Sequence, residues 1–91
     1  MIGIDSKISK SKEIDATDLN GEKVMMNIEK GIYYSLNEVG SRIWELMKKD
    51  ITVQEIINIL LMEYEIDNDT CEKAVLAYLK DMEDAELIKV I

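Results

Sequence analysis

The hydrophobic period of this chain changes at Asn37, and that change constrains the fold more than any other feature. Before Asn37 the residues alternate as in a β-strand, in which Ile32, Tyr34 and Leu36 fall on one face and Tyr33 and Ser35 on the other. After it, apolar side chains recur on one helical face: Val39, Ile43, Trp44 and Met47. Asparagine is a favoured helix N-cap residue. We therefore predict a strand over residues 31–36 that runs directly into a helix over residues 38–48.

The residues before this strand predict two partner strands. Asn20-Gly21 is the dipeptide favoured in type I′ hairpin turns, because both residues tolerate positive φ. Alternation resumes over residues 24–28, and residues 29–31 then turn the chain. The pattern predicts a three-stranded antiparallel meander that ends at residue 36.

The first 19 residues carry a weaker signal. Ile8 and Ile14 fall on the same face of a period-two pattern, with Lys10 and Lys12 between them. This combination is typical of a strand near a sheet edge. Residues 1–7 are candidates for disorder.

Two further helices follow the first. Thr52 and Glu55 form a capping box at the start of a helix that extends to about Tyr64. Asp67 or Asp69 then caps a third helix, whose apolar residues recur at helical spacing: Ala74, Val75, Tyr78, Leu79 and Met82. Residues 87–91 have the composition of a strand. The predicted fold is α+β, a winged helix-turn-helix in which a three-stranded antiparallel β-sheet is followed by three α-helices and a short C-terminal strand.

Composition limits the function classes. Residues 1–91 are long enough for one domain, and no linker or repeat divides them. A formal net charge of −8 argues against a nucleic-acid partner, because phosphate binding requires clustered cations. The chain has no His, the commonest general base and neutral metal ligand. Its single cysteine, Cys71, cannot form an internal disulfide or a Cys-cluster metal site. We expect no cofactor and no metal site.

The same composition bears on location. The N-terminal residues lack the continuous apolar run of a signal peptide. No stretch approaches the roughly 18 uninterrupted apolar residues of a membrane span. A single cysteine also suits a reducing compartment. We therefore expect a cytoplasmic protein that has no membrane partner.

The strand over residues 31–36 poses a question of its own. Tyr33 and Tyr34 are neighbours on it, so their side chains must point to opposite faces of the sheet. As the last strand of the meander it is a sheet edge, and the run contains none of the charges or prolines that usually blunt edges. From the residues alone, two interpretations stand equal: a short protected edge, or a dock for an extended peptide by strand addition.

The order of these elements and motifs resembles that of the PqqD-like proteins, which are leader-peptide recognition elements of ribosomally made peptide natural products. The resemblance extends from about residue 8 to the last helix. Its most characteristic part is Tyr-x-Leu-Asn-x-x-Gly-x-x-Ile-Trp, present as Tyr34, Leu36, Asn37, Gly40, Ile43 and Trp44. Thr52-Val53-x-Glu55-Ile56 follows it. The tyrosine pair, and the Asn-Gly-Glu hairpin before a Val-Met-Met strand, are most similar to the standalone members of lasso-peptide pathways.

The resemblance implies a non-catalytic protein that binds a precursor's leader as a fourth strand, in a groove between the third strand and the third helix. The hydrogen-bond ladder would come from the backbone of Ile32, Tyr33, Tyr34, Ser35 and Leu36. Exposed side chains would form pockets for the leader's apolar anchors: Tyr33, Val75, Tyr78, Leu79 and Met82. In lasso pathways such a protein presents the leader to a leader peptidase and to an ATP-dependent macrolactam cyclase. We expect it to be a monomer.

Three alternatives stay open. A winged-helix DNA-binding regulator shares the architecture, but it needs a basic recognition helix. The third helix is acidic, with Lys73 and Lys80 against Glu72, Asp81, Glu83, Asp84 and Glu86. A peptide chaperone of a quinone-cofactor pathway, or of another ribosomal-peptide pathway, would have the same fold and a different client. A homodimer through the exposed edge is the third alternative.

Overall fold

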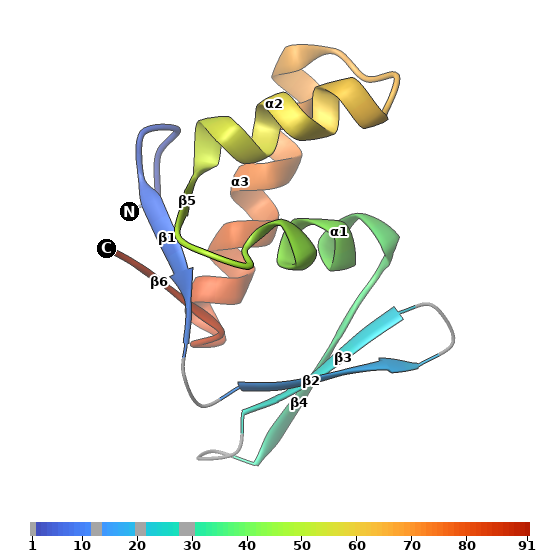
Figure 1. Cartoon of the computed structure of the whole chain (residues 1–91), viewed down its shortest axis with the longest axis vertical. Helices are drawn as coiled ribbons and strands as arrows, with labels where there is room; N and C mark the ends of the chain where they lie inside the picture. The colour runs from blue at the N-terminus through green and yellow to red at the C-terminus, as the bar shows by residue number, and fades with distance from the viewer. Residues whose placement is uncertain (1, 12–13, 20–21, 28–30) are drawn as a thin grey trace.

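A computed structural model describes residues 2–11, 14–19, 22–27 and 31–91 of the chain (Figure 1). The described residues form three helices and six strands. In chain order they are β1 (Lys7–Lys10), β2 (Ile14–Leu19), β3 (Glu22–Asn27), β4 (Ile32–Leu36), α1 (Glu38–Leu46), β5 (Ile51–Thr52), α2 (Val53–Glu63), α3 (Asn68–Asp84) and β6 (Ile88–Val90). The predicted hairpin dipeptide Asn20-Gly21, the last residue of the predicted strand over 24–28, and residues 29 and 30 of the predicted turn lie outside the described residues.

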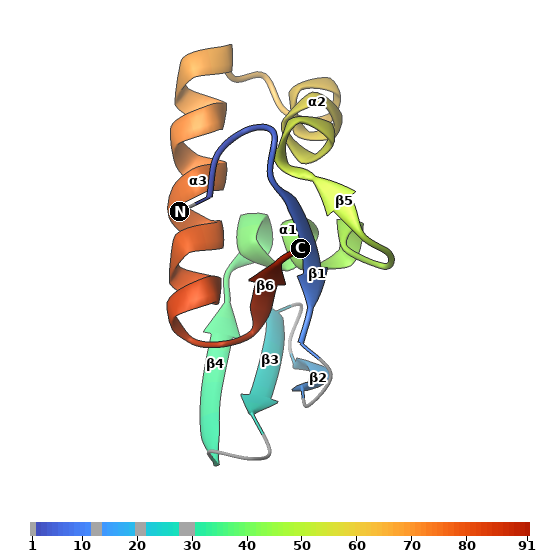
Figure 2. The same cartoon turned by 90° about the vertical axis from the view of Figure 1, so that its left-hand side faces the viewer.

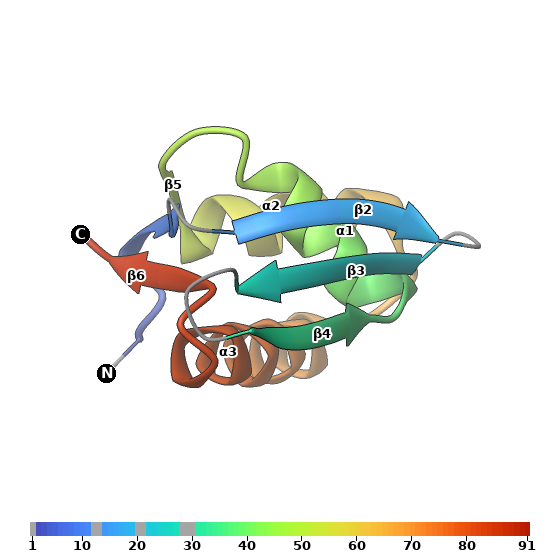
Figure 3. The same cartoon turned by 90° about the horizontal axis from the view of Figure 1, so that it is seen from below.

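The predicted meander is confirmed. β2, β3 and β4 form an antiparallel sheet in that order. Its register places Met25 opposite Tyr34 and Met26 opposite Tyr33. Met25 is fully buried, so its face of the sheet is turned to the core. Figure 3 shows the three strands lying across the helices.

The prediction for the first 19 residues is wrong in one respect. Ile8 and Ile14 belong to two different strands, and β1 is the centre of a second sheet rather than an edge. This sheet has the order β5-β1-β6, and both pairings are antiparallel. Ile8 is fully buried there, opposite Ile51 on one side and Val90 on the other. The C-terminal strand therefore completes this second sheet and not the meander.

The segment before β1 is tied to the start of α2. The Ile4 carbonyl accepts a hydrogen bond from the Gln54 N–H, and the Ser6 carbonyl accepts one from the Val53 N–H, each at 3.0 Å. Ile2 packs against the core. The segment therefore crosses from α3, where Ile2 lies near Leu76 and Ala77, to the first turn of α2 before the chain enters β1.

The three helices begin at the predicted caps. Asn37 Oδ1 accepts from the Gly40 N–H, and Asp67 accepts from the Thr70 N–H, so Asp67 rather than Asp69 caps α3. Thr52 and Glu55 form the full capping box of α2. α1 is shorter than predicted and ends at Leu46. No helix within the described ranges is long and apolar enough to span a membrane.

The hydrophobic core lies between the helices and the two sheets (Figure 2). Trp44 is buried in it, with Lys10 Nζ 4.5 Å from the centre of its ring. Arg42 of α1 and Glu63 of α2 form a two-pronged ion pair at the surface, with a distance of 2.8 Å between Arg42 Nε and Glu63 Oε1. α1 packs against β3 and β4 of the meander, and the C-terminal part of α3 lies near the end of β4.

Candidate functional site

β4 has a free edge within the described part of the chain. It pairs with β3 on one side, and no described strand pairs with it on the other. The C-terminal part of α3 lies on this free side, and Figure 2 shows that it meets β4 at the strand's C-terminal end. An edge strand of this kind leaves every second residue's backbone N–H and C=O without a ladder partner.

The hydrogen bonds of Ser41 indicate which backbone groups of β4 point toward β3 and which point to the free edge. The Ser41 hydroxyl accepts from the Lys23 N–H and donates to the Leu36 carbonyl, each at 3.1 Å. Lys23 and Leu36 are paired residues, so these two groups face each other across the sheet. Because the pattern alternates, the backbone groups of Tyr33 and Ser35 point to the free edge.

A groove of about 300 Å³ lies between β4 and the C-terminal half of α3. Its lining residues come from the end of β4, from α3 and from the segment that follows α3: Tyr34, Ser35, Leu36, Asn37, Tyr78, Asp81, Met82, Ala85 and Leu87. The groove therefore lies beside the last three residues of β4. Ile32 begins β4 at the far end.

The two tyrosines have different positions. Tyr34 is half-buried, lies opposite buried Met25 and lines the groove. Tyr33 is 70% exposed, on the other face of the sheet. Tyr33, which was predicted to form a pocket for the leader, is not among the residues that line the groove, because strand alternation turns its side chain to the other face. It can contact only the outward side chains of a strand added beside β4.

Three predicted site residues on α3 are not exposed. Val75, Leu79 and Met82 are 1%, 0% and 2% exposed, because the helix turns this stripe to the core. Leu79 lies wholly within the core and Val75 lines a different cavity, whereas Met82 reaches the floor of the groove. Of the predicted α3 residues, Tyr78 alone is a half-buried side chain in the groove wall.

Tyr78 is held by the residues that begin α1. Its hydroxyl accepts a hydrogen bond from Asn37 Nδ2 at 2.6 Å. A Cβ added at Gly40 would lie 3.2 Å from Tyr78 Cε1, so the ring packs directly on the glycine. Asn37 therefore caps α1 with its oxygen and ties α1 to α3 with its nitrogen.

Asp81 is the one charged residue among those that line the groove. It is exposed and forms no ion pair with another described residue, and the other residues that line the groove are uncharged. The sequence prediction missed it as a site residue, along with Asn37, Ala85 and Leu87. The available signal was helical spacing, because Asp81 and Ala85 lie one and two turns beyond Tyr78 on the same face.

The groove offers the chemistry of binding. It presents unpaired backbone groups, a tyrosine hydroxyl, one carboxylate and apolar walls. Within the described ranges, no group of three or more His, Cys, Asp or Glu side chains is placed to hold a metal ion. Cys71 lies outside the groove, and burial raises the pKa of its thiol above the usual value, which disfavours the thiolate.

Comparisons with known proteins agree with this geometry. The chain is similar to a solved structure described as TbiB1 in complex with the TbiA(beta) leader peptide, at 28% identity and a TM-score of 0.83, over 89% of this chain and 94% of that one. A lasso peptide synthetase B1 complexed with the leader peptide has the same fold, at 16% identity and a TM-score of 0.75, over 90% of this chain and 96% of that one. A search of curated proteins found no match. The family model of coenzyme PQQ synthesis protein D (PqqD) matches residues 22–88, so the chain belongs to the PqqD family.

Proposed function

We propose that this protein binds the leader region of a lasso-peptide precursor, which adds to the free edge of β4 as a fourth strand. The observation that carries the proposal is the groove itself. It runs along an edge whose Tyr33 and Ser35 backbone groups have no ladder partner, and α3 forms its second wall. The similar TbiB1 structure was solved with a leader peptide.

The width of the site favours a single extended chain. α3 forms the far wall of the groove beside β4, so the groove leaves room for one added strand and not for a second sheet. Its inner stripe of Cys71, Val75, Leu79 and Met82 is part of the core, so moving the helix aside would expose that core. We propose that the protein is a monomer, because edge pairing between two copies would require this displacement.

Binding of this kind requires no catalytic group in the protein. Fixing an extended peptide costs about 1 to 2 kcal/mol of backbone entropy per residue. Ladder hydrogen bonds offset part of this cost, and apolar anchors in the groove must provide the remainder. The protein then presents the ordered leader to a separate leader peptidase and to an ATP-dependent macrolactam cyclase.

A backbone N-methyl scan of the peptide tests the strand-addition mode. The probe is a fluorescein-labelled leader peptide encoded by a short reading frame next to this gene, and binding is followed by fluorescence anisotropy. Each N-methyl group removes one N–H donor and leaves the side chains unchanged. We expect affinity to fall about threefold to tenfold at every second residue of the paired segment, since one ladder hydrogen bond is lost at each.

Protein variants test whether the peptide binds in the groove. Tyr78→Ala removes the wall residue that bonds to Asn37, and it should weaken binding about tenfold or more. Met62→Ala is the matched control, because Met62 is 80% exposed on α2 and lies outside the groove. Thermal denaturation of both variants checks that they are folded. An N-methyl profile without period two, or equal affinities of the two variants, would refute the proposed mode.

A further inference from the structure

The groove contains one charged side chain, and that side chain has no partner within the described part of the chain. Asp81 lines the groove and is exposed, and the other lining residues are uncharged. By contrast, Asp84 on the same helix pairs with Lys80, at 3.4 Å between Lys80 Nζ and Asp84 Oδ2. The carboxylate inside the groove is therefore free to meet a charge on the peptide.

The paired carboxylate lies outside the groove. Lys80 and Asp84 line a separate cavity of about 270 Å³, on the side of α3 near Ile2. Asp81 instead lies with Tyr78 and Ala85 along the groove wall. A peptide strand in the groove is therefore next to the Asp81 carboxylate and not next to that of Asp84.

The end of α3 adds to the negative potential in the groove. Ala85 is the C-cap residue of α3 and lines the groove. The C-terminal end of a helix carries a partial negative charge, which lysine or arginine in the last turn commonly offsets. The last turn of α3 contains no basic residue. Asp81 and the helix end thus both favour a cation that comes from outside the chain.

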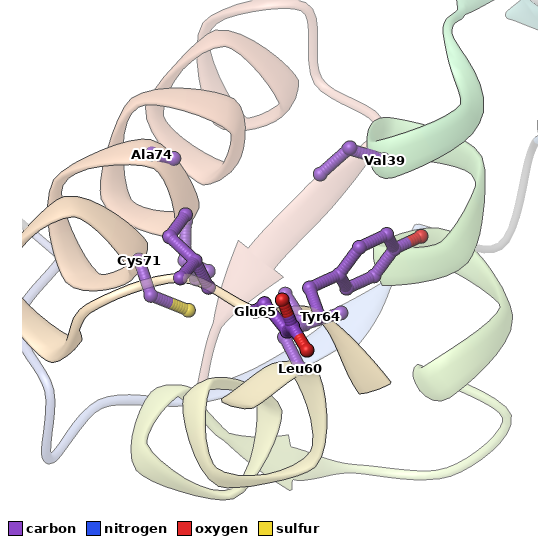
Figure 4. Close-up of a pocket in the computed structure, with 8 residues that line it drawn as sticks. Val39, Leu60, Tyr64, Glu65, Cys71 and Ala74 are labelled. Atoms are coloured by element: carbon purple, nitrogen blue, oxygen red, sulfur yellow. The ribbon is translucent and has the colours of Figure 1, made fainter. Parts of the chain in front are cut away.

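The cavity at the other end of α3 has the opposite arrangement. It has a volume of about 280 Å³ and is lined by all three helices (Figure 4). Its one charged lining residue is Glu65, on the connection between α2 and α3. Glu65 lies near the N-terminus of α3, where the helix carries a partial positive charge. The groove beside β4 is therefore the better place for a cationic side chain.

The geometry of a strand sets the position of that side chain. Asp81 follows Tyr78 by three residues, which corresponds to about 4.5 Å along the helix axis. Alternate residues of an added strand face the groove, about 6.6 Å apart. The long flexible stem of lysine or arginine spans the small difference. The residue opposite Asp81 is thus two positions from the residue that contacts Tyr78.

We infer that the leader peptide carries a lysine or arginine two residues from its Tyr78 contact, and that Asp81 binds this cation. The inference rests on the proposed function. It adds selection by charge to the apolar anchors, because a leader with a neutral or acidic residue at this position should bind more weakly even when it pairs with β4.

The first test removes the charge from the protein. Asp81→Asn keeps the size of the side chain, and Asp84→Asn is the matched control outside the groove. With the labelled leader described above, acetylated at its N-terminus, we expect Asp81→Asn to weaken binding about threefold to thirtyfold. Asp84→Asn should bind within about twofold of the unchanged protein, and the loss in Asp81→Asn should shrink in about 0.5 M NaCl, because salt screens the pair. Thermal denaturation checks that both variants are folded.

The second test identifies the peptide residue. Each lysine and arginine of the acetylated leader is replaced by glutamine in turn. One replacement should weaken binding to the unchanged protein by the same factor and cause no further loss with Asp81→Asn. A leader with glutamate at that position should bind Asp81→Lys more tightly than it binds the unchanged protein, because the swap restores an opposite-charge pair.

The outcomes separate this inference from strand addition. Equal affinities of Asp81→Asn and Asp84→Asn overturn the inference, as do glutamine replacements that weaken binding equally with and without the Asp81 carboxylate. If acetylation alone abolishes the sensitivity to Asp81→Asn, the cation is the N-terminal amine of the peptide and the assignment to a side chain is wrong. In each of these cases a period-two N-methyl profile leaves strand addition standing. Failure of the unchanged protein to bind any neighbouring leader, with or without the acetyl group, overturns both proposals.

Discussion

Replacement of Ser41 by alanine should destabilise the fold at the point where the candidate groove begins. Ser41 is buried in α1, and its hydroxyl lies between the paired residues Lys23 of β3 and Leu36 of β4. It accepts one hydrogen bond from the Lys23 N–H and donates one to the Leu36 carbonyl. The side chain thus fastens the end of β4 to both its partner strand and α1.

The magnitude follows from the two backbone groups that alanine leaves behind. A buried polar group without a partner costs about 1 to 3 kcal/mol. The Leu36 carbonyl contact is buried, whereas the Lys23 N–H contact is half-buried and water can replace part of it. We therefore assign the full cost to the Leu36 carbonyl and only a small part to the Lys23 N–H, and expect a loss of about 2 kcal/mol in the free energy of unfolding. For a chain of this size the midpoint of thermal unfolding should fall by about 8 to 16 °C.

The chain contains its own probe for this measurement. Trp44 is the single tryptophan and is buried, so its fluorescence should report unfolding in urea. Ser35→Ala is the matched control, because it removes the same hydroxyl from an exposed position one residue away from Leu36. It should change the free energy of unfolding by less than about 0.5 kcal/mol. If Ser41→Ala changed the free energy of unfolding no more than this control, the Lys23 N–H would have bonded directly to the Leu36 carbonyl. The bridging role of the Ser41 hydroxyl would then be refuted.

Two further predictions concern other contacts. Thr52→Ala removes the N-cap of α2 and its reciprocal contact with Glu55, and should lower the free energy of unfolding by about 1 kcal/mol in the same urea titration. An unchanged midpoint would contradict this role for the capping box. Hydrogen bonding to the Arg42 guanidinium holds the pKa of the Glu63 carboxyl below its usual value. The pair therefore stabilises the fold fully at a pH above the unfolded-state pKa of Glu63. This stabilisation is lost as the pH falls through the lower folded-state pKa. The difference in melting temperature between the unchanged protein and Glu63→Gln should therefore shrink on acidification from about pH 6 to pH 3. A constant difference over this range would argue against the pair.

The sequence predicted the helices and the meander because their signals are local. Asn37, Thr52 and Asp67 are caps whose partners lie three residues away, and alternation over residues 24–36 is visible without knowing any contact. The second sheet has no such signal. β5 and β6 contain two and three residues, and they meet β1 from more than 40 residues along the chain. No period can be recognised in strands this short.

The site was partly predictable for the same reason. The free edge of β4 followed from its place at the end of the meander, but the choice between Tyr33 and Tyr34 required the register that sets Tyr34 opposite buried Met25. The side chains of α3 raised a similar difficulty. Val75, Leu79 and Tyr78 all fit a helical period. Only the packing of α3 shows that Val75 and Leu79 lie in the core, whereas Tyr78 lines the groove.

Asn37 joins the fold and the groove in one side chain, which affects how substitutions there must be interpreted. Its Oδ1 accepts from the Gly40 N–H and begins α1, while its Nδ2 donates to the Tyr78 hydroxyl across the groove. Alanine would remove both contacts, so weaker peptide binding could arise from a frayed helix or from a loosened wall. Serine keeps a good N-cap oxygen but cannot reach Tyr78 with a second polar group. The difference between serine and alanine at this position therefore isolates the cap, and the difference between asparagine and serine isolates the bridge to Tyr78.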